Sequence, residues 1–111
     1  MELENLKMIN QRPRVSGLLP IRNGEKWLDS TLKDIASILN SDDELVIVND
    51  GSTDGTSRIL NDFRANFSIK IIETKGLGLV KALNLGLKNS INDWVARFDV
   101  DDTYLANRLE E

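Results

Sequence analysis

Residues 45–52 read Leu-Val-Ile-Val-Asn-Asp-Gly-Ser, an apolar run that passes directly into polar residues. A continuous run of aliphatic and β-branched residues is typical of a parallel strand that is covered on both faces. The polar residues that follow predict a loop at the carboxyl end of this strand, which is where open parallel sheets bind ligands. The stretch therefore predicts an α/β fold with a binding edge.

The segments on either side alternate between strand and helix patterns. Strands are predicted at 15–19, 45–48, 69–73 and 94–98, and helices at 25–39 and 79–88. A further helix between the second and third strands is expected to carry Ile59, Leu60 and Phe63 inward. This alternation implies a parallel sheet with right-handed crossovers and helices on its faces. We therefore predict a Rossmann-like parallel sheet of about four strands with helices on both faces.

Single residues add finer expectations. Pro20 is expected to stop the first strand, because proline cannot donate to a sheet ladder. Ser52 or Thr53 is expected to cap the second helix, since a side-chain oxygen can accept from the free amides there. Trp27 and Trp94 are expected to be core aromatics rather than stacking platforms.

The bulk composition excludes several classes of protein. A chain of 111 residues is one domain at most. Its net charge of −4, without a cluster of basic residues, argues against a nucleic-acid partner. Cysteine and histidine are absent, so disulfides, zinc–thiolate sites and histidine bases are excluded. No apolar stretch is long enough for a transmembrane segment, and the polar first residues are not a signal peptide, so we expect a cytoplasmic location.

An acidic stretch follows the last predicted strand. Asp99, Asp101 and Asp102 place three carboxylates within four residues, which is costly unless a cation neutralises them. Hard divalent cations such as Mg²⁺ or Mn²⁺ prefer oxygen ligands of this kind. The polar clusters at 22–23, 49–54 and 75–78 also follow strands, so we expect all of them at one sheet edge. The sequence thus predicts a site for a metal and a phosphate-bearing ligand.

Some of these candidates have plainer explanations. Ser and Asp residues in the loop 50–54 could simply cap a helix. The same loop resembles the opening of a calcium loop, but Asn61 stands where such a loop needs a bidentate glutamate. Lys81 could meet a phosphate near a helix N-terminus, although most lysines lie on the surface.

Four landmarks in order resemble the N-terminal, nucleotide-sugar-binding half of the family-2 glycosyltransferases, which have the GT-A fold. They lie at 19–25, 46–56, 78–87 and 96–102, so the resemblance runs from about residue 15 to residue 108. It implies that Asp50 binds the nucleotide base and that Asp101, with Asp102 assisting, holds Mg²⁺ or Mn²⁺. The donor-binding residues that it implies are Pro20, Arg22, Asn23, Asp50, Ser52, Lys81 and Asp99.

The resemblance also implies a reaction. The donor would be a UDP-sugar, and the reaction an inverting transfer to a hydroxyl acceptor in polysaccharide or cell-surface glycan biosynthesis. Family members carry the acceptor site and the carboxylate base after the metal motif. We therefore expect residues 1–14 to be a leader and 15–111 to be a truncated donor-binding half, inactive alone. The longer protein would bind a glycan or lipid-linked acceptor at the inner membrane face, and the uncovered sheet of this half would favour self-association.

The chain departs from the family pattern in places, and two other classes stay open. Asn49 stands where the family usually has an acid, and Arg22 stands where an aromatic commonly stacks on the base. A guanidinium can also stack on a base. Residues 98–105 resemble the first motif of haloacid dehalogenase-like phosphohydrolases, although that motif normally opens its domain. The other alternative is a non-catalytic nucleotide-binding module.

Overall fold

A computed structural model describes residues 12–100, in which strands and helices alternate along the chain. The strands are β1 (Val15–Ile21), β2 (Glu44–Asp50), β3 (Ser68–Thr74) and β4 (Trp94–Arg97). The helices are α2 (Glu25–Ile38), α3 (Thr56–Asp62) and α4 (Leu79–Lys88). This order confirms the alternation predicted from the sequence. Within residues 12–100, no helix combines the length and the apolar character needed to cross a membrane.

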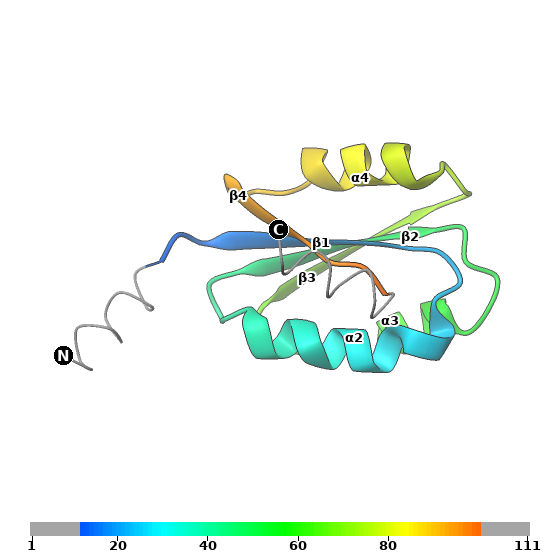
Figure 1. The fold of residues 1–111 in the computed structure, drawn as a ribbon, viewed down its shortest axis with the longest axis horizontal. Coiled ribbons are helices and arrows are strands. Elements are labelled where there is room, and N and C mark those ends of the chain that lie inside the picture. Colours follow the sequence, from blue (N-terminus) through cyan, green and yellow to red (C-terminus); the bar gives the residue numbers. More distant parts are fainter. Residues whose placement is uncertain (1–11, 101–111) are drawn as a thin grey trace.

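All four strands are parallel and lie in the order β3-β2-β1-β4. Helices α2 and α3 cover one face of the sheet and α4 covers the other (Figure 1). The arrangement confirms the predicted Rossmann-like sheet with helices on both faces. It also explains the sequence of β2, because a central strand covered on both sides is buried at all seven positions.

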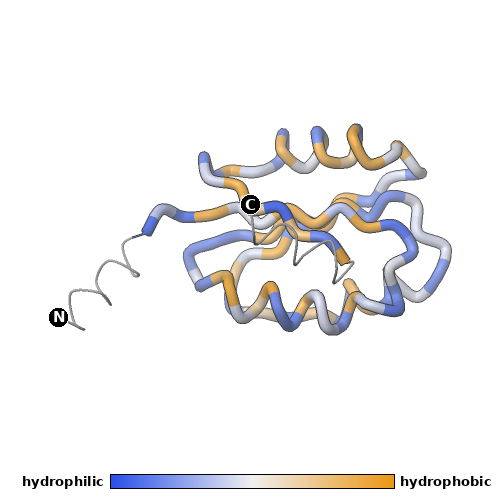
Figure 2. Tube along the Cα trace, in the orientation of Figure 1, coloured by the Kyte–Doolittle hydropathy of each residue, from blue (hydrophilic) through white to orange (hydrophobic). Residues whose placement is uncertain are grey.

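The core is divided between the two faces of the sheet. Figure 2 shows hydrophobic segments gathered along the strands and alternating with hydrophilic ones along the helices. Helix α4 comes very close to the sheet at Gly86, where an added Cβ would lie 2.1 Å from Cδ1 of Leu18. The smaller core cluster lies on this face and consists of Leu18, Val46, Val48 and Ala82.

The first strand does not stop before Pro20, as the sequence suggested, but continues to Ile21. Phe98 donates its backbone N–H to the carbonyl of Leu18, so the peptide at residue 18 faces β4. The backbone N–H and C=O groups of alternate residues point toward the same neighbouring strand. The backbone nitrogen of Pro20 therefore also points toward the β4 side. Strand β4 has ended at that level, so the missing N–H of proline costs no ladder hydrogen bond.

The two tryptophans are not core residues, which corrects the expectation from sequence. Trp94 is 64% exposed on the edge strand β4, and Trp27 is 42% exposed on α2. The inner face of α2 is already filled by smaller aliphatic residues, including Leu28 and Ile35. Trp27 instead lies beneath the ammonium of Lys26, at 5.5 Å from the ring centre.

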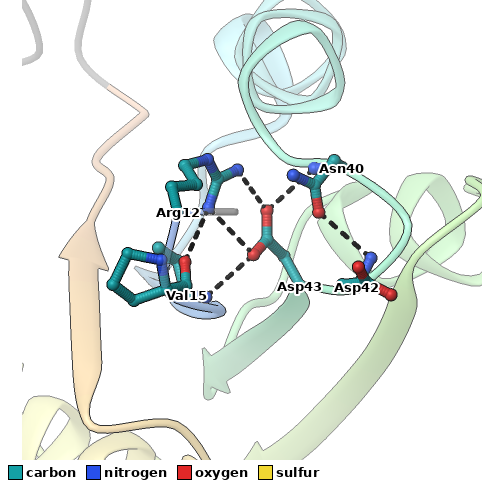
Figure 3. Close-up of polar contacts among 6 residues, drawn as sticks. Arg12, Val15, Asn40, Asp42 and Asp43 are labelled. Carbon is teal, nitrogen blue, oxygen red and sulfur yellow. Dashed lines mark hydrogen bonds and ion pairs between the residues drawn. The ribbon is translucent and has the colours of Figure 1, made fainter. Parts of the chain in front are cut away.

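A buried carboxylate holds the amino end of β2 in place. Asp43 is 3% exposed and forms an ion pair with Arg12 at 2.6 Å (Figure 3). It also accepts the backbone N–H groups of Val15 and Asn40, each at 2.8 Å. Burial alone would raise the pKa of Asp43, but these hydrogen bonds and the charge of Arg12 lower it below its ordinary value. Asp43 thus ties the start of β1 to the loop between α2 and β2.

Candidate functional site at the carboxyl edge of the sheet

The loops after β1 and β2 are joined through two of the residues singled out from the sequence. The backbone N–H of Asn23 donates to the hydroxyl of Ser52 at 3.0 Å. In return, Oδ1 of Asn23 accepts the N–H of Thr53 at 2.7 Å. Asn23 has a φ of 53°, a left-handed conformation that asparagine tolerates better than most residues. Both candidates therefore shape the edge by holding each other in place.

Neither Ser52 nor Thr53 caps helix α3: its N-cap is Gly55, which has no side chain to cap with, and Asp54 lies just before it. The helix begins at Thr56, and Oδ1 of Asp54 accepts the backbone N–H of Thr56 at 2.9 Å. Hydrogen bonds from Thr56 are the main reason why the pKa of Asp54 lies below its ordinary value. The predicted capping by Ser52 or Thr53 is therefore wrong, because the helix begins too far along the chain for either side chain to be its cap.

The N-termini of α2 and α3 also cap each other. Oδ2 of Asp54 accepts the N–H of Glu25 at 3.2 Å, and the hydroxyl of Thr56 accepts the N–H of Gly24 at 3.0 Å. Oε1 of Glu25 accepts the N–H of Gly55 at 3.0 Å. Amides that each helix leaves without partners are therefore satisfied by the neighbouring loop. These hydrogen bonds join the two helix N-termini beside the carboxyl ends of β1 and β2.

Asp50, the last residue of β2, is held by the end of β3 and by the loop that follows it. It is 4% exposed. Its Oδ1 accepts the hydroxyl of Thr74 at 2.5 Å and the N–H of Leu77 at 2.6 Å. Its Oδ2 accepts the N–H of Gly78 at 2.9 Å. An ionised carboxylate has about four acceptor positions, so within residues 12–100 one position, on Oδ2, is left.

These contacts keep Asp50 charged. Burial alone would raise the pKa of its carboxyl group. The hydrogen bonds from Thr74, Leu77 and Gly78, together with the positive charge of Arg22, outweigh burial and lower the pKa below its ordinary value. Asp50 is therefore an anion near neutral pH, held in one orientation.

Gly51 lets the loops after β2 and β3 meet. Its φ is +77°, and an added Cβ would lie 2.9 Å from the backbone nitrogen of Gly76. A side chain here would combine an unfavourable backbone conformation with a contact against immovable backbone. The glycine thus permits the close approach on which the setting of Asp50 depends.

Asp50 and Arg22 line a pocket at this edge. The pocket has a volume of 240 Å³, and its walls combine the two opposite charges with apolar surface. A larger hollow of 410 Å³ lies between α2 and α3, away from the four polar clusters. The smaller pocket is lined by Pro20, Ile21, Arg22, Asp50, Gly78, Leu79 and Ala82.

The acidic stretch begins beside the same edge. Asp99 is 9% exposed, and its Oδ1 lies 3.4 Å from a guanidinium nitrogen of Arg97. Val100 packs against the turn after β1, because an added Cβ on Gly24 would lie 3.1 Å from Val100 Cγ2. Within residues 12–100, no group of three acidic side chains could hold a metal ion. The predicted ligand pair 101–102 lies outside the described residues.

Some site residues do not meet as expected, and others were missed. Lys81 is exposed on α4 and is not among the residues that line the pocket. The sequence did not predict Thr74 as a site residue, because a threonine at the end of a strand is common. Aligning the first residues of the two predicted strands, 45 and 69, would have placed Thr74 beside Asp50, as the structure does.

The amide at Asn49 has a local explanation. Its Nδ2 donates to Oε1 of Glu73 at 3.0 Å and to the hydroxyl of Ser57 at 2.8 Å. An aspartate at this buried position would face the Glu73 carboxylate with a like charge. The amide is therefore matched to the acid on the neighbouring strand.

Comparisons with known proteins agree with one another. The model of the family described as Glycosyl transferase family 2 matches residues 16–111. EpsE of Bacillus subtilis, named as a glycosyltransferase, is 37% identical over 93% of this chain and 38% of its own length. The poly-beta-1,6-N-acetyl-D-glucosamine synthase of Staphylococcus epidermidis is 33% identical over 78% of this chain and 21% of its own. The chain thus spans well under half the length of these relatives.

Solved structures give the same answer for the fold. TarS 1–349 of S. aureus, in complex with UDP-GlcNAc, aligns with a TM-score of 0.72 and 29% identity. The alignment covers 79% of this chain and 26% of that one. The mannosyltransferase PcManGT of Pyrobaculum calidifontis, in complex with GDP-Man and Mn²⁺, gives a TM-score of 0.72 and 27% identity. That alignment covers 81% of this chain and 28% of the other.

Proposed function

Because this chain belongs to glycosyl transferase family 2, we propose that its carboxyl edge binds the nucleotide of a UDP-sugar donor. The fold is that of a partial GT-A domain, the class to which the matched solved structures belong. The observation that carries the proposal is the pocket that Asp50 and Arg22 both line. The reaction of the longer protein would be an inverting transfer to a hydroxyl acceptor.

The hydrogen-bond count at Asp50 favours uracil as the base. Uracil presents one ring N–H between two carbonyl groups, whereas guanine presents two neighbouring N–H groups on its Watson–Crick edge. Three acceptor positions of Asp50 are filled by Thr74, Leu77 and Gly78, which leaves one within the described residues. One position suits the single N–H of uracil, and Arg22 can stack on the ring or donate to a carbonyl.

The other proposed contacts with the nucleotide-sugar are assigned from where each residue lies. Asp99 would lie near the ribose, and Lys81 would meet a phosphate. Pro20 lines the pocket, while Asn23 and Ser52 set the shape of its rim.

A divalent cation completes this proposal. Asp101 and Asp102 would hold Mg²⁺ or Mn²⁺, because carboxylate oxygens suit a hard cation. When bound, the metal would act as a Lewis acid for the charge that builds on the leaving diphosphate.

Acceptor chemistry is proposed for the longer protein. Attack by a hydroxyl group needs a base within hydrogen-bond reach, and we propose that this base and the acceptor site lie in the part beyond these residues. The relative that is a poly-beta-1,6-N-acetyl-D-glucosamine synthase supports a role in polysaccharide or cell-surface glycan assembly. The cytoplasmic location and the self-association of the 111-residue chain stay predictions.

Calorimetric titration of the 111-residue chain tests the proposal. UDP should bind more tightly with Mn²⁺ than without it, and more tightly than GDP under the same conditions. Replacing Asp50 by asparagine should abolish the preference for UDP. The amide NH₂ group would then lie opposite the N–H of the base, and two hydrogen-bond donors cannot pair. Binding of neither nucleotide, with or without Mn²⁺, would contradict the proposed function.

A further inference from the structure

We infer that Thr74 is a positioning residue that determines which oxygen of Asp50 faces the base of the donor. The inference rests on the proposed function and adds to it a residue that sets the preference for uracil over guanine. Thr74 would not touch the donor itself. It would act through its hydrogen bond to the carboxylate.

The register of the sheet brings the two side chains together. Asp50 and Thr74 are the last residues of β2 and β3 and are direct partners in the parallel ladder. Neighbouring residues in register point to the same face of a sheet. The hydroxyl of Thr74 donates to Oδ1 of Asp50, and it accepts the N–H of Gly76 at 3.5 Å. One hydroxyl thus connects the carboxylate to the loop that also supplies two of its amide donors.

The effect of Thr74 is to saturate one oxygen. Oδ1 accepts both Thr74 and Leu77, whereas Oδ2 accepts Gly78 alone among the described residues. The open acceptor position therefore belongs to Oδ2. Without the hydroxyl, each oxygen would have one open position, the arrangement with which a carboxylate accepts two parallel N–H donors. Guanine offers such a pair and uracil does not.

A pair of substitutions separates the hydroxyl from the shape of the side chain. Thr74→Val keeps the β-branched shape and removes the donor, whereas Thr74→Ser keeps the donor. UDP and GDP affinities would be measured by calorimetry in Mn²⁺ for both variants and the parent chain. The pKa of Asp50 would be followed by carboxyl-carbon NMR in the same three proteins.

We expect Thr74→Val to weaken UDP binding about tenfold, because the carboxylate that accepts the uracil N–H is no longer held by the hydroxyl. GDP binding should weaken less, so that the ratio of the two affinities moves toward one. The pKa of Asp50 should rise, because the hydrogen bond that Thr74 gives to the ionised form is lost. Thr74→Ser should resemble the parent chain in all three measurements.

An unchanged affinity ratio and an unchanged Asp50 pKa in a folded Thr74→Val chain would overturn the inference. If the valine variant does not fold, Thr74→Ala gives the same test with a smaller side chain. If the parent chain binds neither nucleotide, the proposed function fails and the specificity role fails with it. The Asp50 pKa in the variants then shows separately whether Thr74 holds the carboxylate.

Discussion

The two ends of β2 carry the same residue type in two different settings. Asp43 precedes the strand and Asp50 ends it, and they are 3% and 4% exposed. Both have a pKa below the ordinary value, because hydrogen bonds outweigh the effect of burial. The two oxygens of Asp43 accept two bonds each, from Arg12, Val15 and Asn40. Among the described residues, Asp50 accepts three bonds, one from Thr74 at the end of β3 and two from the loop that follows.

This difference separates a structural carboxylate from a binding one. Arg12 neutralises Asp43 directly, and the guanidinium and amides fill every acceptor position. In the described part of the chain, Asp50 accepts hydrogen bonds from neutral donors only. The positive charge that lowers its pKa is that of Arg22, which lines the same pocket. A buried anion with a remaining acceptor position beside a pocket is suited to a ligand. A saturated anion far from the pocket is suited to stability.

The largest expected effect is on stability at the amino end. Asp43→Asn should lower the free energy of unfolding by about 3 kcal/mol, because the new amide faces donors and the buried ion pair is lost. Chemical denaturation measures this loss. A change below about 1 kcal/mol would contradict the structural role of Asp43. Nucleotide binding by the folded variant should be unchanged, since Asp43 is not a pocket residue.

Acid should weaken the fold through the same carboxylates. Their folded pKa values are depressed, so the stabilisation is complete above the unfolded value of about 3.9 and is lost as the pH falls through the folded pKa. The free energy of unfolding should therefore drop as the pH is lowered below about 4. The drop should be smaller in Asp43→Asn than in the parent chain. Equal slopes for both proteins would argue against this assignment.

At the carboxyl end, Asp50→Asn should act mainly on binding. We expect a loss of UDP affinity of more than about tenfold and a loss of stability of about 1–2 kcal/mol, smaller than at Asp43. The stability term arises because the new amide faces the N–H of Gly78 or Leu77. Calorimetry and denaturation of the same protein samples measure the two terms separately.

Gly51→Ala should disturb the site through the backbone. The positive φ and the contact with the backbone at Gly76 together predict a loss of about 1–2 kcal/mol in stability. UDP binding should weaken as well, since the loop that holds Asp50 must shift. Gly76→Ala is the matched control, because its φ is also positive but an added Cβ meets no atom within 4 Å. Equal effects on binding would show that strain alone, without the loop contact, explains the result.

The smallest effect is expected at Ser52. Ser52→Ala removes the acceptor for the N–H of Asn23 and should cost about 1 kcal/mol of stability. UDP affinity should change by less than about threefold, because Ser52 shapes the rim and does not line the pocket. A tenfold loss in calorimetry would instead indicate a direct contact with the donor.

The sequence predicted the fold well because its signals are local. The buried run of β2 and the strand–helix alternation need no knowledge of distant contacts. The extension of β1 through Pro20 was missed because it depends on where β4 ends. Trp94 was misplaced because composition does not reveal that its strand lies at the edge of the sheet. Both errors concern the edge strand β4, whose place in the sheet and whose end depend on pairing between distant parts of the chain.

The sequence brought forward two residues that line the pocket, but not the contacts that hold them. Asp50 and Arg22 were singled out by type and position, and the structure places both on one pocket. Thr74 and Glu25 were missed, because their importance lies in hydrogen bonds to other loops. The roles assigned to Lys81 and to the acidic pair 101–102 stay predictions.

One measurement tests the central claim most directly, namely UDP titration of Asp43→Asn and Asp50→Asn side by side in Mn²⁺. Both variants exchange one buried carboxylate for an amide on the same strand. We predict that the folded Asp43→Asn chain binds UDP like the parent chain, while Asp50→Asn loses more than about tenfold in affinity. Equal losses in the two variants, or full binding by Asp50→Asn, would contradict the claim that the incomplete carboxylate is the binding one.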